Sequence, residues 1–213
     1  MSAETVVVGL LDGGVDAALS GHLEASRAFV DEPVTGRLGH GTAIAEIILH
    51  HAPEAPLLHA RVFGERQRTT PELVAAGLDW LRDEGARIVN MSFGLRHDRM
   101  VLRQAVARAH AVGMILVASV PARGAMVYPG GYPGVIRVSG DARCAPGDLS
   151  ALGGDPADYG ACPRDAADRL GGASFAAAHL TGLLARHLRA TERDPRALLD
   201  RLARFHGRER RLA

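Results

Sequence analysis

Residues 171–182 read Gly-Gly-Ala-Ser-Phe-Ala-Ala-Ala-His-Leu-Thr-Gly, and an apolar stretch at helical spacing, 183–188, follows them. Small residues around a single Ser predict a tight turn that leads into a helix. The Ser, at position 174, would have an exposed hydroxyl and an N–H at the positive end of the helix dipole, where a developing oxyanion is stabilised. A Ser before a helix is more commonly an N-cap than a catalytic nucleophile. The interpretation of Ser174 therefore depends on the rest of the chain.

Two further motifs precede this segment. Residues 6–14, Val-Val-Val-Gly-Leu-Leu-Asp-Gly-Gly, predict a buried strand that brings Asp12 into a glycine turn. Residues 39–45, Gly-His-Gly-Thr-Ala-Ile-Ala, place His40 at the start of an apolar helix. Asp, then His, then Ser is the chain order of the subtilisin triad, and it differs from the orders in chymotrypsin and the α/β-hydrolases.

On these motifs the chain resembles the subtilisin-like serine peptidases. The resemblance implies a serine endopeptidase in which Ser174 is the nucleophile, His40 takes its proton and Asp12 orients the imidazole. The serine segment is similar to the family signature Gly-Thr-Ser-Met-Ala-x-Pro-His, with departures at Ala173, Phe175 and Ala178.

The remainder of the chain alternates strand-like and helical segments, without an internal repeat or a linker. This alternation indicates one domain over residues 1–213, of the α/β class, with three layers: a mostly parallel sheet covered by helices on both faces. We expect strands at 57–63, 88–93 and 114–120, and helices at 40–51, 71–84 and 99–111. Residues 16–38 predict a loop with a short helix, and residues 194–213 predict a final Arg-rich amphipathic helix.

Residues 92–94, Ser-Phe-Gly, resemble the substrate-binding edge of the family. An extended peptide would pair backbone to backbone with Ser92, Phe93 and Gly94, as an added strand. Residues 128–136 resemble the turn and strand behind the specificity pocket. Val127 stands just before them, where the family often has Gly. A valine there would narrow the pocket, so we expect cleavage after a small residue.

The family's second oxyanion donor, an Asn side chain, is missing. Ala122 occupies the matching position, and Asn90, the only Asn in the chain, belongs to the strand before the substrate edge. In subtilisin, loss of this Asn costs about 10²–10³ in turnover, which slows an enzyme without abolishing catalysis. The backbone N–H of Ser174 remains as one donor, and Ser119, Arg123 or the substrate itself are candidates for the second.

These features leave two functions open. One is a slow serine endopeptidase dedicated to one protein or peptide, for example in leader-peptide removal. In size the chain resembles the short leader-trimming subtilisin-like peptidases, such as the type that acts in quinohemoprotein amine dehydrogenase maturation. The other is a pseudopeptidase that binds a peptide without cutting it. Retention of all three triad residues favours the first.

A metal site is the weaker third alternative. Its ligands would be His50, His51 and His59, but adjacent helical residues do not face the same ligand. We therefore expect neither a metal nor another cofactor.

Composition sets limits on partners and compartment. The 213 residues carry a formal net charge of +1 and are 47% hydrophobic, which is ordinary for a globular protein. Scattered basic residues argue against nucleic acid and against an anionic membrane as partners. No apolar run approaches the ~18 residues of a membrane span. Because no secretory signal precedes the first strand, we expect a cytoplasmic protein with Cys144 and Cys162 as thiols.

Overall fold

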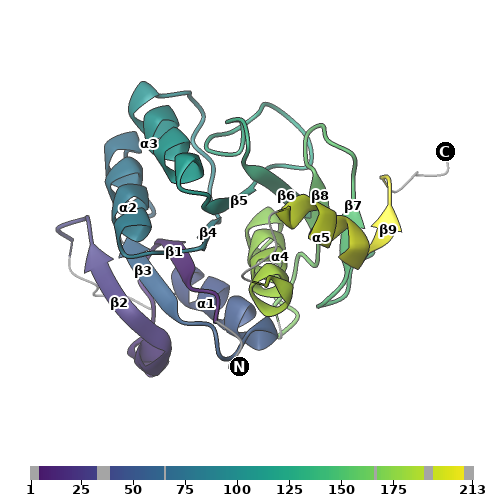
Figure 1. Ribbon diagram of the computed structural model, residues 1–213, viewed down its shortest axis with the longest axis horizontal. Coiled ribbons are helices and arrows are strands. Elements are labelled where there is room, and N and C mark those ends of the chain that lie inside the picture. The colour runs from purple at the N-terminus through teal and green to yellow at the C-terminus, as the bar shows by residue number, and fades with distance from the viewer. Residues whose placement is uncertain (1–4, 33–38, 65, 166, 190–193, 209–213) are drawn as a thin grey trace.

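The computed structural model describes residues 5–32, 39–64, 66–165, 167–189 and 194–208. In these ranges the centre of the molecule is a nine-stranded sheet in the order β2-β3-β1-β4-β5-β6-β8-β7-β9 (Figure 1). All neighbouring strands are parallel except β7 and β8. The strands are β1 (Val8–Asp12), β2 (Leu23–Ala28), β3 (Leu57–Arg61), β4 (Ile88–Met91), β5 (Ile115–Ser119), β6 (Ile136–Gly140), β7 (Leu149–Ala151), β8 (Tyr159–Ala161) and β9 (Ala203–His206).

Helices cover the two faces of the sheet as separate layers. On one face α1 (His40–His51) packs against α4 (Ala173–His187), and on the other α2 (Pro71–Asp83) packs against α3 (Met100–Ala111) (Figure 1). Successive strand residues point to opposite faces, so adjacent residues of β1 belong to different clusters: Leu10 packs with α1, and Leu11 packs with α2 and α3. The predicted three-layer α/β class is confirmed. None of the described helices is both long enough and apolar enough to cross a membrane.

The structure adds an edge strand that the sequence did not predict. A short 3-10 helix, η1 (Ala17–His22), forms within the region expected to hold one, but the next residues form β2 and pair in parallel with β3. Most β2 side chains are exposed, so the strand lacks the buried alternation by which strands are recognised. The rest of that region includes residues 33–38, which lie outside the described residues.

The carboxyl end of the chain also differs from the expectation. Helix α5 (Pro195–Leu202) begins after Asp194, whose side chain accepts hydrogen bonds from the N–H groups of Arg196 and Ala197. The helix then stops, and β9 joins the sheet beside β7. The single helix predicted over 194–213 is therefore too long, because alternate residues of 203–206 are half-buried and exposed, as in a strand. Residues 209–213 lie outside the described residues.

The order of the strands explains where a site can form. Strand β1 lies between β3 and β4, so the chain leaves β1 toward one side of the sheet and later returns to the other side. A crevice opens at the carboxyl ends of parallel strands where the strand order reverses in this way. Asp12 is the last residue of β1, and Ser92 directly follows β4, so both lie at this carboxyl edge of the sheet.

Candidate active site

Asp12 and His40 are joined by a hydrogen bond. His40 Nδ1 lies 2.8 Å from Asp12 Oδ1, and the same oxygen accepts the N–H of Gly13 at 2.7 Å. The Asp12 side chain is 2% exposed, whereas 33% of the His40 side chain is accessible to solvent. A carboxylate that holds Nδ1–H leaves Nε2 of the neutral ring free to accept a proton. Asp12 Oδ2 is also buried, and it has no hydrogen-bond partner among the described residues.

The carboxylate changes the basicity of the imidazole. Burial of the His40 ring disfavours its charged form, but the hydrogen bond to Asp12 and the negative charge of Asp12 outweigh this effect, so the pKa of His40 lies above its ordinary value. A general base works best when its pKa lies near the working pH. The pair is therefore suited to take up a proton near neutral pH.

Helix α4 carries Ser174 at its amino-terminal end. The helix begins at Ala173 after Gly172, whose φ of +62° favours glycine. The carbonyl of Pro163 accepts hydrogen bonds from the N–H groups of both Gly171 and Gly172, which fixes this turn. Ser174 is the second residue of the helix, so it is not the N-cap that the sequence also allowed. Its N–H has no partner within the helix and is available to a ligand.

The hydroxyl of Ser174 is engaged with the end of β4. Ser174 Oγ donates to the carbonyl of Ser92 at 2.8 Å, and Ser92 Oγ donates to the carbonyl of Ser174 at 2.9 Å. Among the described residues, the Ser174 hydroxyl thus pairs with Ser92 rather than with His40.

Asn90 extends this network in a way that the sequence analysis missed. Asn90 Nδ2 donates to Ser92 Oγ at 2.9 Å, and Thr181 Oγ1 donates to Asn90 Oδ1 at 3.1 Å. Both Asn90 and Thr181 are fully buried. The only Asn of the chain therefore ties β4 to α4. A polar residue within a buried strand is the signal that could have indicated this role.

The predicted substrate edge lies beside the predicted specificity residue. After Ser92 and Phe93 the chain reaches Gly94, which is exposed, and the backbones of Leu95 and Tyr128 then exchange two hydrogen bonds. A Cβ atom on Gly94 would lie 2.6 Å from Val127 Cγ2, so the valine side chain packs directly on the glycine backbone. The valine thus fills space between these two segments.

The predicted oxyanion segment is at the same edge of the sheet. Ser119 ends β5 and is buried, whereas Ala122 and Arg123 are exposed in the turn that follows. Because β5 is parallel to β4, this turn lies at the carboxyl ends of the strands. No side-chain amide comes from positions 119–124.

The three histidines considered for a metal do not converge on one site: the rings of His50 and His51 are in edge contact, but His51 and His59 have different hydrogen-bond partners. His51 Nε2 lies 2.7 Å from His179 Nδ1, while His59 contacts Gly13 and Ser26. Burial and the neighbouring His179 lower the pKa of His51 to about 3, so this ring is neutral. Among the described residues, no group of three or more His, Cys, Asp or Glu side chains could hold a metal ion.

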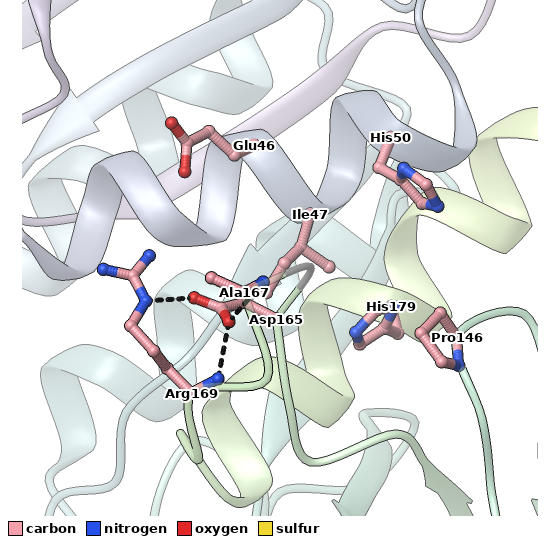
Figure 2. Close-up of a pocket in the computed structure, with 8 residues that line it drawn as sticks. All are labelled: Glu46, Ile47, His50, Pro146, Asp165, Ala167, Arg169 and His179. Carbon is pink, nitrogen blue, oxygen red and sulfur yellow. Dashed lines mark hydrogen bonds and ion pairs between the residues drawn. The ribbon is translucent and has the colours of Figure 1, made fainter.

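A cavity of about 360 Å³ lies between α1 and the segment that leads to Ser174 (Figure 2). His179, five residues after Ser174 on α4, is one of its lining residues, and its Nε2 donates to the carbonyl of Arg164 at 2.7 Å. The other lining residues are Glu46, Ile47, His50, Pro146, Asp165, Ala167 and Arg169. The cavity therefore adjoins α4, the helix that carries Ser174. It includes His50, one of the histidines considered for a metal, but none of the predicted catalytic, oxyanion or substrate-binding residues.

Comparison with known sequences identifies the same family that the sequence motifs resemble. The profile of the Subtilase family matches residues 3–203. Subtilisin DY from Bacillus licheniformis is 27% identical over 206 residues, which cover 84% of this chain and 75% of that protein. Subtilisin BL from Lederbergia lenta is 30% identical over 151 residues, which cover 65% of this chain and 56% of that protein. The chain thus spans between half and three quarters of the length of these relatives.

Comparison with solved structures shows the same fold. A mutant of the protease domain of PatA superimposes with a TM-score of 0.70 at 24% identity, covering 92% of this chain and 86% of that chain. The prenylagaramide maturation protease PagA also gives a TM-score of 0.70, at 21% identity, with coverages of 93% and 82%.

Proposed function

Because the chain belongs to the subtilase family of serine endopeptidases, we propose that it cleaves peptide bonds by acyl transfer to Ser174, with His40 as general base and Asp12 as the orienting carboxylate. The observation that carries this proposal is the 2.8 Å hydrogen bond between His40 Nδ1 and Asp12 Oδ1, which leaves His40 Nε2 free as the base. It forms at the same edge of the sheet as the end of β4, to which the Ser174 hydroxyl is bonded.

The nucleophile needs one rearrangement before it reacts. The Ser174 hydroxyl donates to the Ser92 carbonyl, so this hydrogen bond must break before the proton can pass to His40 Nε2. An extended peptide added along residues 92–94 brings its own N–H groups to that backbone. Substrate and nucleophile therefore compete for the Ser92 carbonyl, so binding of a peptide favours the breaking of that hydrogen bond.

The reaction then follows the order of acyl transfer. His40 takes the Ser174 proton as the oxygen attacks the scissile carbonyl, and the oxyanion forms beside the N–H of Ser174 at the start of α4. His40 passes the proton to the leaving amine, and the acyl-enzyme forms. Water next attacks the acyl carbon with His40 again as base, which releases the second product and restores Ser174.

We further propose that the enzyme is slow and dedicated to one protein or peptide. The missing oxyanion Asn at position 122 supports a low rate, and the packing of Val127 on Gly94 supports a narrow pocket that admits a small residue. PagA, the prenylagaramide maturation protease, has the same fold and is a precedent for a maturation protease of this architecture. Leader-peptide removal is the processing step that fits best, and its connection to quinohemoprotein amine dehydrogenase maturation stays a prediction. So do the cytoplasmic location and the absence of a cofactor.

The test of the chemistry is covalent labelling. The purified protein and its Ser174→Ala variant are incubated with a fluorophosphonate, and intact mass and peptide mapping show whether an adduct forms. We expect one adduct, on Ser174, in the parent protein only. An absence of adduct in folded protein would contradict the proposal.

A peptide-binding pseudopeptidase is the second candidate. Two observations favour it: the Ser174 hydroxyl is bonded to Ser92, and no Asn occupies position 122. This candidate predicts peptide binding, measured by fluorescence anisotropy, without any fluorophosphonate adduct.

A further inference from the structure

His59 is a polar residue in the middle of an apolar strand. It lies in β3 between Leu58 and Ala60, opposite Leu10 of β1 on one side and Ser26 of β2 on the other, and it is 4% exposed. A buried imidazole is costly unless both of its nitrogens have partners. Both have partners here, and they lie on different elements.

The contacts of His59 determine its tautomer. Nε2 lies 2.8 Å from the carbonyl of Gly13, and Nδ1 lies 2.9 Å from Ser26 Oγ. A carbonyl can only accept, so Nε2 carries the hydrogen, and Nδ1 of the neutral ring accepts the hydrogen of the serine hydroxyl. Burial lowers the pKa of His59, and the positive charge of Arg61 acts in the same direction. The Gly13 hydrogen bond and the negative charge of Asp12 act in the opposite direction but do not outweigh burial. The ring therefore remains neutral near pH 7.

Gly13 links this ring to Asp12. Its N–H donates to Asp12 Oδ1, the oxygen that also holds His40, while its carbonyl accepts from His59. The backbone of α1 approaches the same turn so closely that a Cβ atom on Gly41 would lie 2.8 Å from the Gly13 oxygen. The turn after Asp12 is therefore held by β3 on one side and by the start of α1 on the other.

We propose that His59 is a positioning residue of the proposed active site: its Nε2–H holds the Gly13 carbonyl and thereby fixes the turn that presents Asp12 Oδ1 to His40. The inference rests on the proposed function, because it assigns His59 a role only through Asp12 and His40. Without the Nε2–H donor, the Gly13 peptide can rotate and Asp12 Oδ1 loses its fixed place. The hydrogen bond that raises the proton affinity of His40 then weakens.

The test compares substitutions that keep or remove this donor. His59→Met removes it with a flexible side chain of similar size, and His59→Leu is the alternative if the first variant does not fold. His59→Gln keeps an N–H near the place of Nε2. Ser26→Ala removes only the outer contact of the ring and is the matched control. Circular dichroism and thermal melting establish that each variant is folded.

Two measurements distinguish a role of His59 in positioning Asp12 from a role in packing alone. The first is the fluorophosphonate labelling rate between pH 5 and 9, which rises as His40 loses its proton. The second is the titration of the His40 ring followed by NMR. For His59→Met we expect a labelling rate about 10- to 100-fold lower, as for a misplaced catalytic group, and a His40 midpoint at lower pH. His59→Gln and Ser26→Ala should keep the parent midpoint.

Each outcome decides the proposal. A folded Met or Leu variant with the parent midpoint would show that His59 serves stability alone, even if its melting temperature falls. A shifted midpoint in His59→Gln would also overturn the proposal, and this remains measurable if neither apolar variant folds. If the parent protein takes no label, the proposed peptidase function fails, but the NMR titration still tests the effect of His59 on His40.

Discussion

The Asp12–His40 half of the proposed site and the Ser174 half are built differently. In the first half the carboxylate is buried, its Oδ1 is held by Gly13 and His40, and the base is oriented before any substrate arrives. In the second half the hydroxyl donates to the Ser92 carbonyl, and the neighbouring oxyanion segment has Ala122 in place of an amide. Under the proposed mechanism, the group that takes the proton is therefore arranged in advance, whereas release of the nucleophile and stabilisation of the oxyanion depend on the substrate.

Breaking the pre-arranged half should have the largest effect. In Asp12→Asn the side chain no longer holds Nδ1–H, so the imidazole takes the wrong tautomer. We expect the fluorophosphonate labelling rate to fall about 10⁴-fold, the loss known for the corresponding change in a Ser-His-Asp enzyme. Asp16→Asn, at an exposed residue that caps η1, is the control and should label at the parent rate. A loss below tenfold in Asp12→Asn would contradict the orienting role.

Completing the other half should raise the rate. Ala122→Asn supplies the amide that the oxyanion segment lacks, and we expect an increase of up to about 10²–10³ in kcat, the value of this donor in subtilisin. The measurement is steady-state cleavage of an internally quenched peptide with Ala before the scissile bond. Ala122→Leu tests for an effect of side-chain size and should give no increase. Equal rates for the Asn and Leu variants would show that other groups stabilise the oxyanion.

The smallest effect is expected on specificity. Val127→Gly removes the side chain that packs on Gly94, so the pocket should admit larger residues. We expect the ratio of kcat/KM for Phe over Ala before the scissile bond to rise about 10- to 100-fold, since each methylene in an apolar pocket discriminates by about 1–3 kcal/mol. Val112→Gly, at the exposed C-cap residue that follows α3, should leave the ratio unchanged. If Val127→Gly had the same Phe-to-Ala ratio of kcat/KM as the parent protein, Val127 would not be part of the specificity pocket.

Much of the fold could be predicted because its signals are local. The alternation of buried strands and amphipathic helices determines the sheet and its two helical layers, and a proline after Thr70 marks the start of α2. The strand at 23–28 lacks such a signal because it lies at the edge of the sheet, where both of its faces can stay polar. The strand after Leu202 is stabilised by its pairing with β7, which is distant in the chain.

The sequence could nominate the residues of the proposed site, but not the contacts that they make. Asp12 and His40 lie in glycine-rich motifs that indicate their local backbone structure: a turn after a strand for Asp12 and the start of a helix for His40. The partner of the Ser174 hydroxyl depends on Ser92, 82 residues earlier in the chain, and no pattern encodes a choice of rotamer. His59 was considered only as a metal ligand, since its contacts with Gly13 and Ser26 arise from the pairing of β3 with two other strands.

Under the proposed mechanism, the chain order of the elements around β1 determines when the protein can become active during synthesis. Both neighbours of β1 come later in the chain, and the helix that carries Ser174 comes later still. Chains emerge from the ribosome amino terminus first, so a nascent chain that ends at α3 holds Asp12 and His40 but no nucleophile. Under the proposed mechanism, an unfinished chain therefore cannot cleave the ribosome-bound chains around it.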